Sequence, residues 1–146
     1  MMSHKTDSDP NVTQTVPFLA VSNLEASVRF YVDGLGFKIT NKWLNEGKLQ
    51  WCWLQLGGAA LMLQEFKERH SRVPDEKVGK DVSIYFICKD ALAIYRELMS
   101  RGIQASRPFV GNGMWVTGLS DPDGFSLYFE SVTDQPEDTE YIEQDK

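Results

Sequence analysis

The sequence holds few of the residues from which metal centres and disulfide frameworks are built. Its 146 residues include two cysteines and two histidines, and the cysteines do not form a CxxC motif. Cys52 and Cys88 stand in apolar stretches, a setting typical of buried, reduced thiols. His4 and His70 fall in a polar N-terminal stretch and a charged central one, so a shared metal ion is not expected. The sequence therefore predicts neither a redox centre nor a two-histidine metal site.

Long apolar runs and basic clusters are missing as well. No run approaches the roughly 18–20 apolar residues of a membrane-spanning helix, and residues 1–14 lack the apolar centre of a signal peptide. No stripe of basic and aromatic residues indicates nucleic-acid binding. We therefore expect a cytoplasmic protein that binds neither membranes nor nucleic acids.

The net charge of −6 is carried by the two ends of the chain. Residues 132–146 contain six acidic side chains and one lysine, and residues 1–14 contain two acidic side chains and one lysine. The residues between these segments hold equal numbers of acidic and basic side chains. A polar acidic segment is typical of a disordered, solubilising tail. We expect a disordered N-terminal tail (1–14), one domain (15–131) and an acidic C-terminal tail (132–146).

A strand followed by a helix is predicted near the start of this domain. Residues 15–21 are mostly β-branched and apolar, which favours a strand. Ser22 and Glu25 form a capping-box pattern, and Gly34 and Gly36 can close the helix that begins there. The apolar side of this helix is spaced by four, three and four residues: Leu24, Val28, Tyr31 and Leu35.

The same pattern returns once, near Val82. Asp90 is the expected helix cap, and Gly102, which follows Gly36 by 66 residues, is the expected stop. Farther along, the strand–turn–strand stretch 49–66 aligns with 114–131 and matches Glu65 to Glu130. Two stretches repeated in the same order indicate paired modules rather than a solenoid.

Each module is predicted to contain one helix and four strands. Module one covers 15–66, a charged linker covers 67–80, and module two covers 81–131. The predicted fold class is α+β, with paired βαβββ modules that form curved mixed sheets around a cleft.

The repeated plan carries two sequence motifs, FYVDGLGF at the end of the first helix and SDPDGFSLYFE in the last hairpin. With them, the chain resembles the vicinal oxygen chelate superfamily over about residues 14–131. That superfamily includes glyoxalase I, extradiol dioxygenases, fosfomycin-resistance enzymes and bleomycin-resistance proteins. The resemblance implies paired modules around a U-shaped cleft, commonly in a homodimer, with the cleft formed within one chain or between two.

Metal-dependent members of this superfamily take their ligands from the first and last strands of each module. The resemblance places these positions at Val16, at Val82 or Ser83, at Leu63 and at Tyr128. None of these residues is a metal ligand of the expected kind, so neither a metal nor another cofactor is expected. A shift of the last strands by two residues brings in Glu65 and Glu130, a matched pair of carboxylates at the cleft rim.

Aromatic residues are the more prominent feature of the expected cleft. Trp51 and Trp53 alternate along one strand and therefore share a face. Aromatic faces bind flat conjugated ligands, although the same side chains are also common in cores and dimer interfaces. No catalytic residue is assigned. The predicted ligand-binding residues are Trp43, Trp51, Trp53, Leu63, Glu65, Phe109, Trp115, Tyr128 and Glu130.

Within the superfamily, the chain is most similar to the metal-free bleomycin-resistance-like branch. This likeness implies a homodimeric, metal-independent protein that sequesters a flat aromatic or antibiotic-like small molecule. One alternative is a metal-dependent lyase, isomerase or dioxygenase that uses Glu65 and Glu130 as carboxylate ligands. Another is an interaction protein whose sheets serve only dimer assembly.

Overall fold

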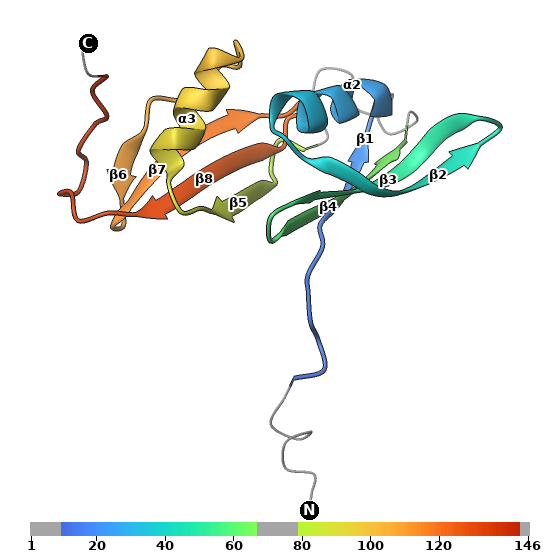
Figure 1. Ribbon diagram of the computed structural model, residues 1–146, viewed down its shortest axis with the longest axis horizontal. Coiled ribbons are helices and arrows are strands. Elements are labelled where there is room, and N and C mark those ends of the chain that lie inside the picture. The colour runs from blue at the N-terminus through green and yellow to red at the C-terminus, as the bar shows by residue number, and fades with distance from the viewer. Residues whose placement is uncertain (1–9, 67–78, 144–146) are drawn as a thin grey trace, which may run out of the picture.

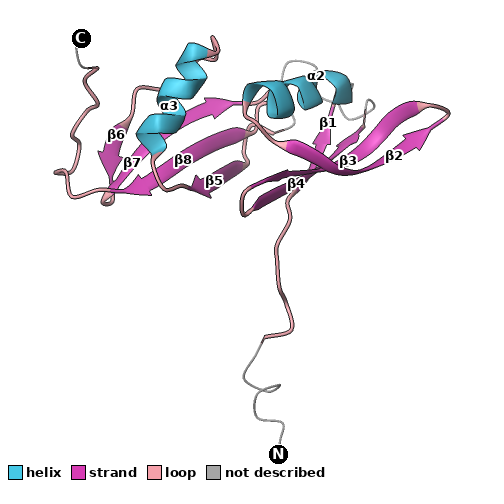
Figure 2. Cartoon of the chain, viewed as in Figure 1, coloured by secondary structure: helices cyan, strands magenta, loops and turns pink. Residues whose placement is uncertain are grey.

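The computed structural model describes residues 10–66 and 79–143. These residues form two four-stranded mixed sheets that lie side by side, with both helical segments on the same side of the sheets (Figure 1). No described helix covers the opposite side of either sheet, as the colouring by secondary structure shows (Figure 2). The predicted α+β class is therefore confirmed. Most of the predicted linker, and residues 1–9 of the predicted N-terminal tail, lie outside the described residues.

Module one follows the predicted order of elements. Its strands are arranged β1-β4-β3-β2, with β1 parallel to β4 and the other pairs antiparallel. The α-helix continues directly into a π-helical segment, η1. The elements are β1 (Phe18–Val21), α2 (Leu24–Val28), η1 (Arg29–Gly34), β2 (Lys38–Asn45), β3 (Lys48–Leu56) and β4 (Ala59–Glu65).

Module two repeats this arrangement. Its strand order is β5-β8-β7-β6, and β5 is again parallel to the last strand of its module. The prediction of paired βαβββ modules is therefore confirmed. The elements are β5 (Ser83–Ile87), α3 (Ala91–Ser100), β6 (Phe109–Gly111), β7 (Met114–Ser120) and β8 (Ser126–Val132).

The two helices begin differently from each other. Asp90 caps α3 as predicted, because its carboxylate accepts the Ala93 N–H at 3.1 Å. The predicted capping box at Ser22 is wrong: Asn23 is the N-cap of α2, and its side chain accepts the Ala26 N–H at 3.1 Å. Asn and Ser are comparable caps, and Asn23 holds the extended backbone conformation from which the helix starts.

Hydrophobic side chains from both modules form one core beneath the helices. Leu24 and Tyr31 of the first helical stretch are buried, as the predicted apolar stripe requires. The ring of Phe37 in module one lies 6.0 Å from that of Phe86 in module two, which stacks on Phe129. The core is therefore continuous across the boundary between the modules.

A buried polar cluster joins the modules beside this core. The Tyr31 hydroxyl donates to Asp121 Oδ2 at 2.7 Å, and the Ser22 N–H donates to the Asp123 carboxylate at 3.1 Å. Asp121 Oδ1 also accepts the N–H groups of Asp123 and Phe125, each at 2.9 Å. Burial raises the pKa of both Tyr31 and Asp121 above their ordinary values. This cluster fixes the final hairpin of module two against the first helical stretch of module one.

The acidic C-terminal segment pairs with β6 instead of projecting freely into solvent. Thr139 accepts the N–H of Val110 at 2.9 Å, and Tyr141 donates its N–H to the Pro108 carbonyl at 2.9 Å. The composition of this segment is typical of a disordered tail, yet its described part is hydrogen-bonded to β6 and the residues beside it. A run of backbone hydrogen bonds and an aromatic side chain compensate for its polar composition. None of the described helices is long and apolar enough to cross a bilayer.

Candidate functional site

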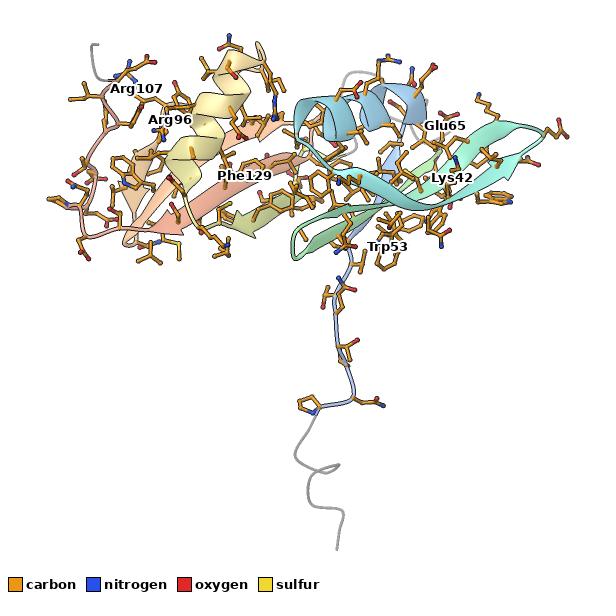
Figure 3. All side chains as sticks on the ribbon, viewed as in Figure 1. Lys42, Trp53, Glu65, Arg96, Arg107 and Phe129 are labelled. Carbon is orange, nitrogen blue, oxygen red and sulfur yellow. The ribbon has the colours of Figure 1, made fainter. Side chains whose placement is uncertain are left out.

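The exposed side of the module-one sheet carries three tryptophans. Trp51 and Trp53 flank Cys52, which is fully buried on the helix side, so both indoles point to the opposite side. Trp43 is the direct partner of Trp51 on the neighbouring strand and lies on the same side. Figure 3 shows Trp53 projecting from this side of the sheet. We call this surface the open face of module one; it consists of Phe18, Trp43, Trp51, Trp53, Met62 and Gln64.

The open face of module one is only partly shielded from solvent. The exposed fraction of Trp43 is 53%, whereas Trp51 and Trp53 are half-buried. The indole Nε1–H of Trp53 donates to Gln55 Oε1 at 2.9 Å. This hydrogen bond fixes the orientation of the ring and leaves its faces available for stacking.

Module two has a corresponding open face built from tyrosines. Tyr85 on β5 stacks on Tyr128 on β8, with ring centroids 4.8 Å apart and planes inclined by 21°. Tyr128 lies so close to Gly118 that a Cβ atom there would come within 2.6 Å of the ring. Glu130 and Phe109 are on the same side, through their shared pairing with Val116. The open face of module two consists of Tyr85, Ile87, Phe109, Val116, Tyr128 and Glu130.

Three of the predicted ligand-binding residues lie on the helix side of the sheets. Leu63 is fully buried in the core. Glu65 accepts the N–H of Leu24 at 2.8 Å, at the start of the first helix, and its side chain is 9% exposed. Trp115 packs edge-to-face against Tyr141, with centroids 6.4 Å apart. The other six predicted residues lie on the two open faces.

Glu65 and Glu130 do not form a matched pair, and this part of the prediction is wrong. Glu65 accepts the first amide of α2, and the corresponding amide of α3, on Ala91, is bound by the Ser131 hydroxyl at 2.8 Å. The structural counterpart of Glu65 is therefore Ser131. The alignment of the last strands was off by one residue, and a one-residue shift turns a side chain to the other face of a strand.

The four positions suggested for metal ligands do not converge on one surface. Leu63 faces the helix side, whereas Tyr128 lies on the open face of module two, and Val16 precedes β1. Within the described part of the chain, no three His, Cys, Asp or Glu side chains are grouped closely enough to hold a metal ion.

Both cysteines are free thiols. Burial raises the pKa of Cys52 to about 11 and also raises the pKa of Cys88. Because the thiolate is the reactive form, neither residue is prepared to act as a nucleophile near neutral pH.

An apolar groove of about 430 Å³ lies where the two modules meet. The β3–β4 hairpin supplies Leu56, and β5 supplies Tyr85 and Ile87. The latter two also belong to the open face of module two, so the groove continues from that face. Tyr85 was missed by sequence reasoning because its position opposite Tyr128 depends on a pairing register that no local pattern reveals.

Comparisons with known proteins add a family match to this geometry. The model of the family described as Glyoxalase/Bleomycin resistance protein/Dioxygenase superfamily matches residues 12–129. A search of curated proteins gave no match.

Several solved structures share the fold. TnmS3, an antibiotic binding protein from Streptomyces sp. CB03234, is 19% identical with a TM-score of 0.65, covering 86% of this chain and 100% of that one. A putative glyoxalase family protein from Bacillus anthracis is 18% identical, with the same TM-score and coverage. A glyoxalase/bleomycin resistance protein/dioxygenase from Nocardioides is 17% identical with a TM-score of 0.65, covering 91% of this chain and 92% of that one. At these identities, the likeness concerns the fold alone.

Proposed function

Because the chain belongs to the Glyoxalase/Bleomycin resistance protein/Dioxygenase superfamily, we propose that it binds a flat aromatic small molecule without a metal ion. The observation that carries this proposal is the set of aromatic side chains on the two open faces. The fold it shares with TnmS3, an antibiotic binding protein, supports an antibiotic-like ligand.

The tryptophans of module one form the main contact surface in this proposal. An aromatic ligand stacked on one indole gains about 0.5–1.5 kcal/mol beyond the burial of its area. Trp51 and Trp53 are half-buried, and Trp53 is fixed by Gln55, so little side-chain freedom is lost when a ligand binds. Gln64, the direct partner of Trp51, adds an amide that can orient polar groups of the ligand.

Metal independence is supported by the chemistry of the open faces. Their members are aromatic, aliphatic, thioether or amide side chains except for Glu130, and a single carboxylate does not hold a divalent ion. The enzyme alternative relied on Glu65 and Glu130 acting together, and these residues point to opposite sides of their sheets. We therefore favour sequestration of the ligand over its chemical conversion.

We further propose that a second copy of the chain completes the cleft. Both helical segments lie on the same side of the sheets (Figure 2), so the two open faces of one chain do not enclose a ligand between them. The open faces expose large apolar side chains, including Tyr85 at 54% and Ile87 at 67%. Exposed apolar surface of this kind is typical of interaction sites.

Because both thiols are free, we place the protein in a reducing compartment, the cytoplasm.

Tryptophan fluorescence locates the ligand. The full chain is titrated with a bleomycin-type drug and with a panel of planar aromatic compounds, and we expect saturable quenching by at least one of them. Trp53→Leu should then raise Kd about tenfold, the factor that corresponds to about 1.4 kcal/mol of lost stacking. Trp115→Phe removes an indole from the helix side and is the matched control, with unchanged Kd.

Two results would contradict the proposal. Equal Kd values for Trp53→Leu and the original chain would show that the ligand does not bind on the open face of module one. Dimers that bind no member of the panel would favour the alternative in which the sheets serve only assembly.

A further inference from the structure

Residues 133–143, which we call the strap, form an additional edge on the sheet of module two. The strap runs beside β6 at one end of the molecule (Figure 1). Val110 in the middle of β6 donates its N–H to Thr139 and accepts the N–H of Asp138, both at 2.9 Å. Tyr141 donates its N–H to the Pro108 carbonyl at 2.9 Å. The outward-facing polar groups of β6 are thus satisfied by the strap.

Side chains hold the strap in this position. The Tyr141 ring contacts Tyr95 of α3 at 5.6 Å and Trp115 of β7 at 6.4 Å, in both cases with strongly inclined planes. Glu137 accepts the backbone N–H of Asn112 at 2.7 Å. The Tyr141 ring and the Glu137 carboxylate therefore connect the acidic strap to α3, to β7 and to the turn between β6 and β7.

The outer edges of the two sheets are protected by different means. In module one, β2 is one of the two terminal strands, and it carries Lys38 and Lys42 together with two register shifts relative to β3. Charged side chains and irregular pairing both discourage another chain from adding to an edge. In module two, β6 has the sequence Phe-Val-Gly, with no charge and a regular pairing to β7. The strap is the feature that covers this edge.

We propose that the β6 edge is a strand-pairing surface for a second copy of this chain, and that the strap keeps it closed. Without the strap, the N–H and C=O of Val110 both face outward. Two such residues related by a two-fold axis exchange both hydrogen bonds, which is the hydrogen-bonded pair of an antiparallel ladder. Phe109, which is 43% exposed, then adds apolar surface beside the new pair. The family match covers residues 12–129, which include β6 and end before the strap begins.

A chain ending at Val132 tests this proposal. Its mass and that of the full chain are measured by sedimentation over a range of concentrations, after circular dichroism has shown that both are folded. We expect the average mass of the shortened chain to rise more steeply with concentration than that of the full chain. A synthetic peptide of residues 133–146 should reverse this gain, whereas the same peptide with Tyr141→Ala should not. A dimer formed through the open faces is expected for both chains, so only the difference in mass between the two chains measures association through β6.

Equal masses for two folded chains would overturn the proposal. Should the shortened chain fail to fold, Tyr141→Ala in the full chain is compared with Ile142→Ala, a substitution at an exposed neighbouring residue. Hydrogen exchange at the Val110 amide should become about tenfold faster in Tyr141→Ala, the factor for about 1.4 kcal/mol of lost ring contacts. The mass of this variant should also rise with concentration, and Ile142→Ala should match the original chain in both respects. Faster exchange in Tyr141→Ala without any gain in mass contradicts pairing through β6.

Discussion

The hydrogen bond between Tyr31 and Asp121 offers a sharp test of how the modules are held together. Tyr31→Phe removes a hydroxyl that donates to a buried carboxylate oxygen at 2.7 Å and leaves the rest of the ring in the core. Asp121 keeps its two backbone donors, but the oxygen that faced Tyr31 loses the hydroxyl that donated to it. A hydrogen bond to a charged group contributes about 1.5–3 kcal/mol, so the free energy of unfolding should fall by that amount near neutral pH.

The pH dependence of this effect has a defined sign. Burial raises the pKa of Asp121 in the folded chain, and the bond from Tyr31 partly opposes that rise. Between the ordinary carboxyl pKa of about 3.9 and the higher folded value, the folded state holds more protons, so stability falls as pH rises. Tyr31→Phe removes the opposing bond, so it widens this pH window and makes the total fall in stability larger. Below the ordinary pKa the carboxyl is neutral, and the cost of the substitution should shrink to about 0.5–1.5 kcal/mol.

Urea unfolding of the original and substituted chains at pH 7 and pH 3 measures both effects. At pH 7 the melting temperature should also fall, by roughly 5–10 °C. Tyr85→Phe, which removes an exposed hydroxyl, is the matched control and should change little. A cost below about 0.5 kcal/mol at pH 7, or the same cost at both pH values, would refute the assignment of this bond as a charged link between the modules.

Two further predictions follow from the site. Glu65→Ala should lower the free energy of unfolding by about 0.5–2 kcal/mol, because the Leu24 amide at the start of α2 loses an acceptor, and should leave ligand affinity unchanged. Glu130→Ala on the open face should weaken ligand binding in the titration and leave the free energy of unfolding unchanged. If both variants changed the same one of these two quantities, the placement of Glu65 and Glu130 on opposite sides of the sheets would be contradicted. Both thiols should react slowly with a disulfide reagent at pH 7 and faster as pH rises, with half-buried Cys88 reacting before buried Cys52. Rapid modification of Cys52 in the folded chain at pH 7 would contradict its raised pKa.

The repeat could be predicted because short-range sequence patterns determine its elements. Apolar periodicity, the Asp90 cap and the glycines that end each helix report on short-range structure, and they predicted the order of elements along each βαβββ module. Gly36 and Gly102 both adopt the left-handed conformation expected of helix stops, with φ of +94° and +79°.

The errors arose where a decision depended on pairing between distant segments. Glu65 and Glu130 were matched from an alignment that was one residue out, and on a strand that error reverses the face. Trp115 was expected on the cleft wall because neither its contact with Tyr141 nor the pairing of the strap can be read from composition. The open faces themselves required the register of β5 against β8, which brings Tyr85 onto Tyr128.

The central claim is that the open faces bind an aromatic ligand without a metal ion. It is tested most directly by titrating the chain, purified without chelator and assayed for metal content, with the same panel of planar aromatic compounds in the presence of excess chelator. We predict negligible metal, saturable tryptophan quenching that the chelator does not alter, and a ligand recovered with its mass unchanged. Stoichiometric metal, binding that the chelator abolishes, or a ligand recovered with a changed mass would contradict the account.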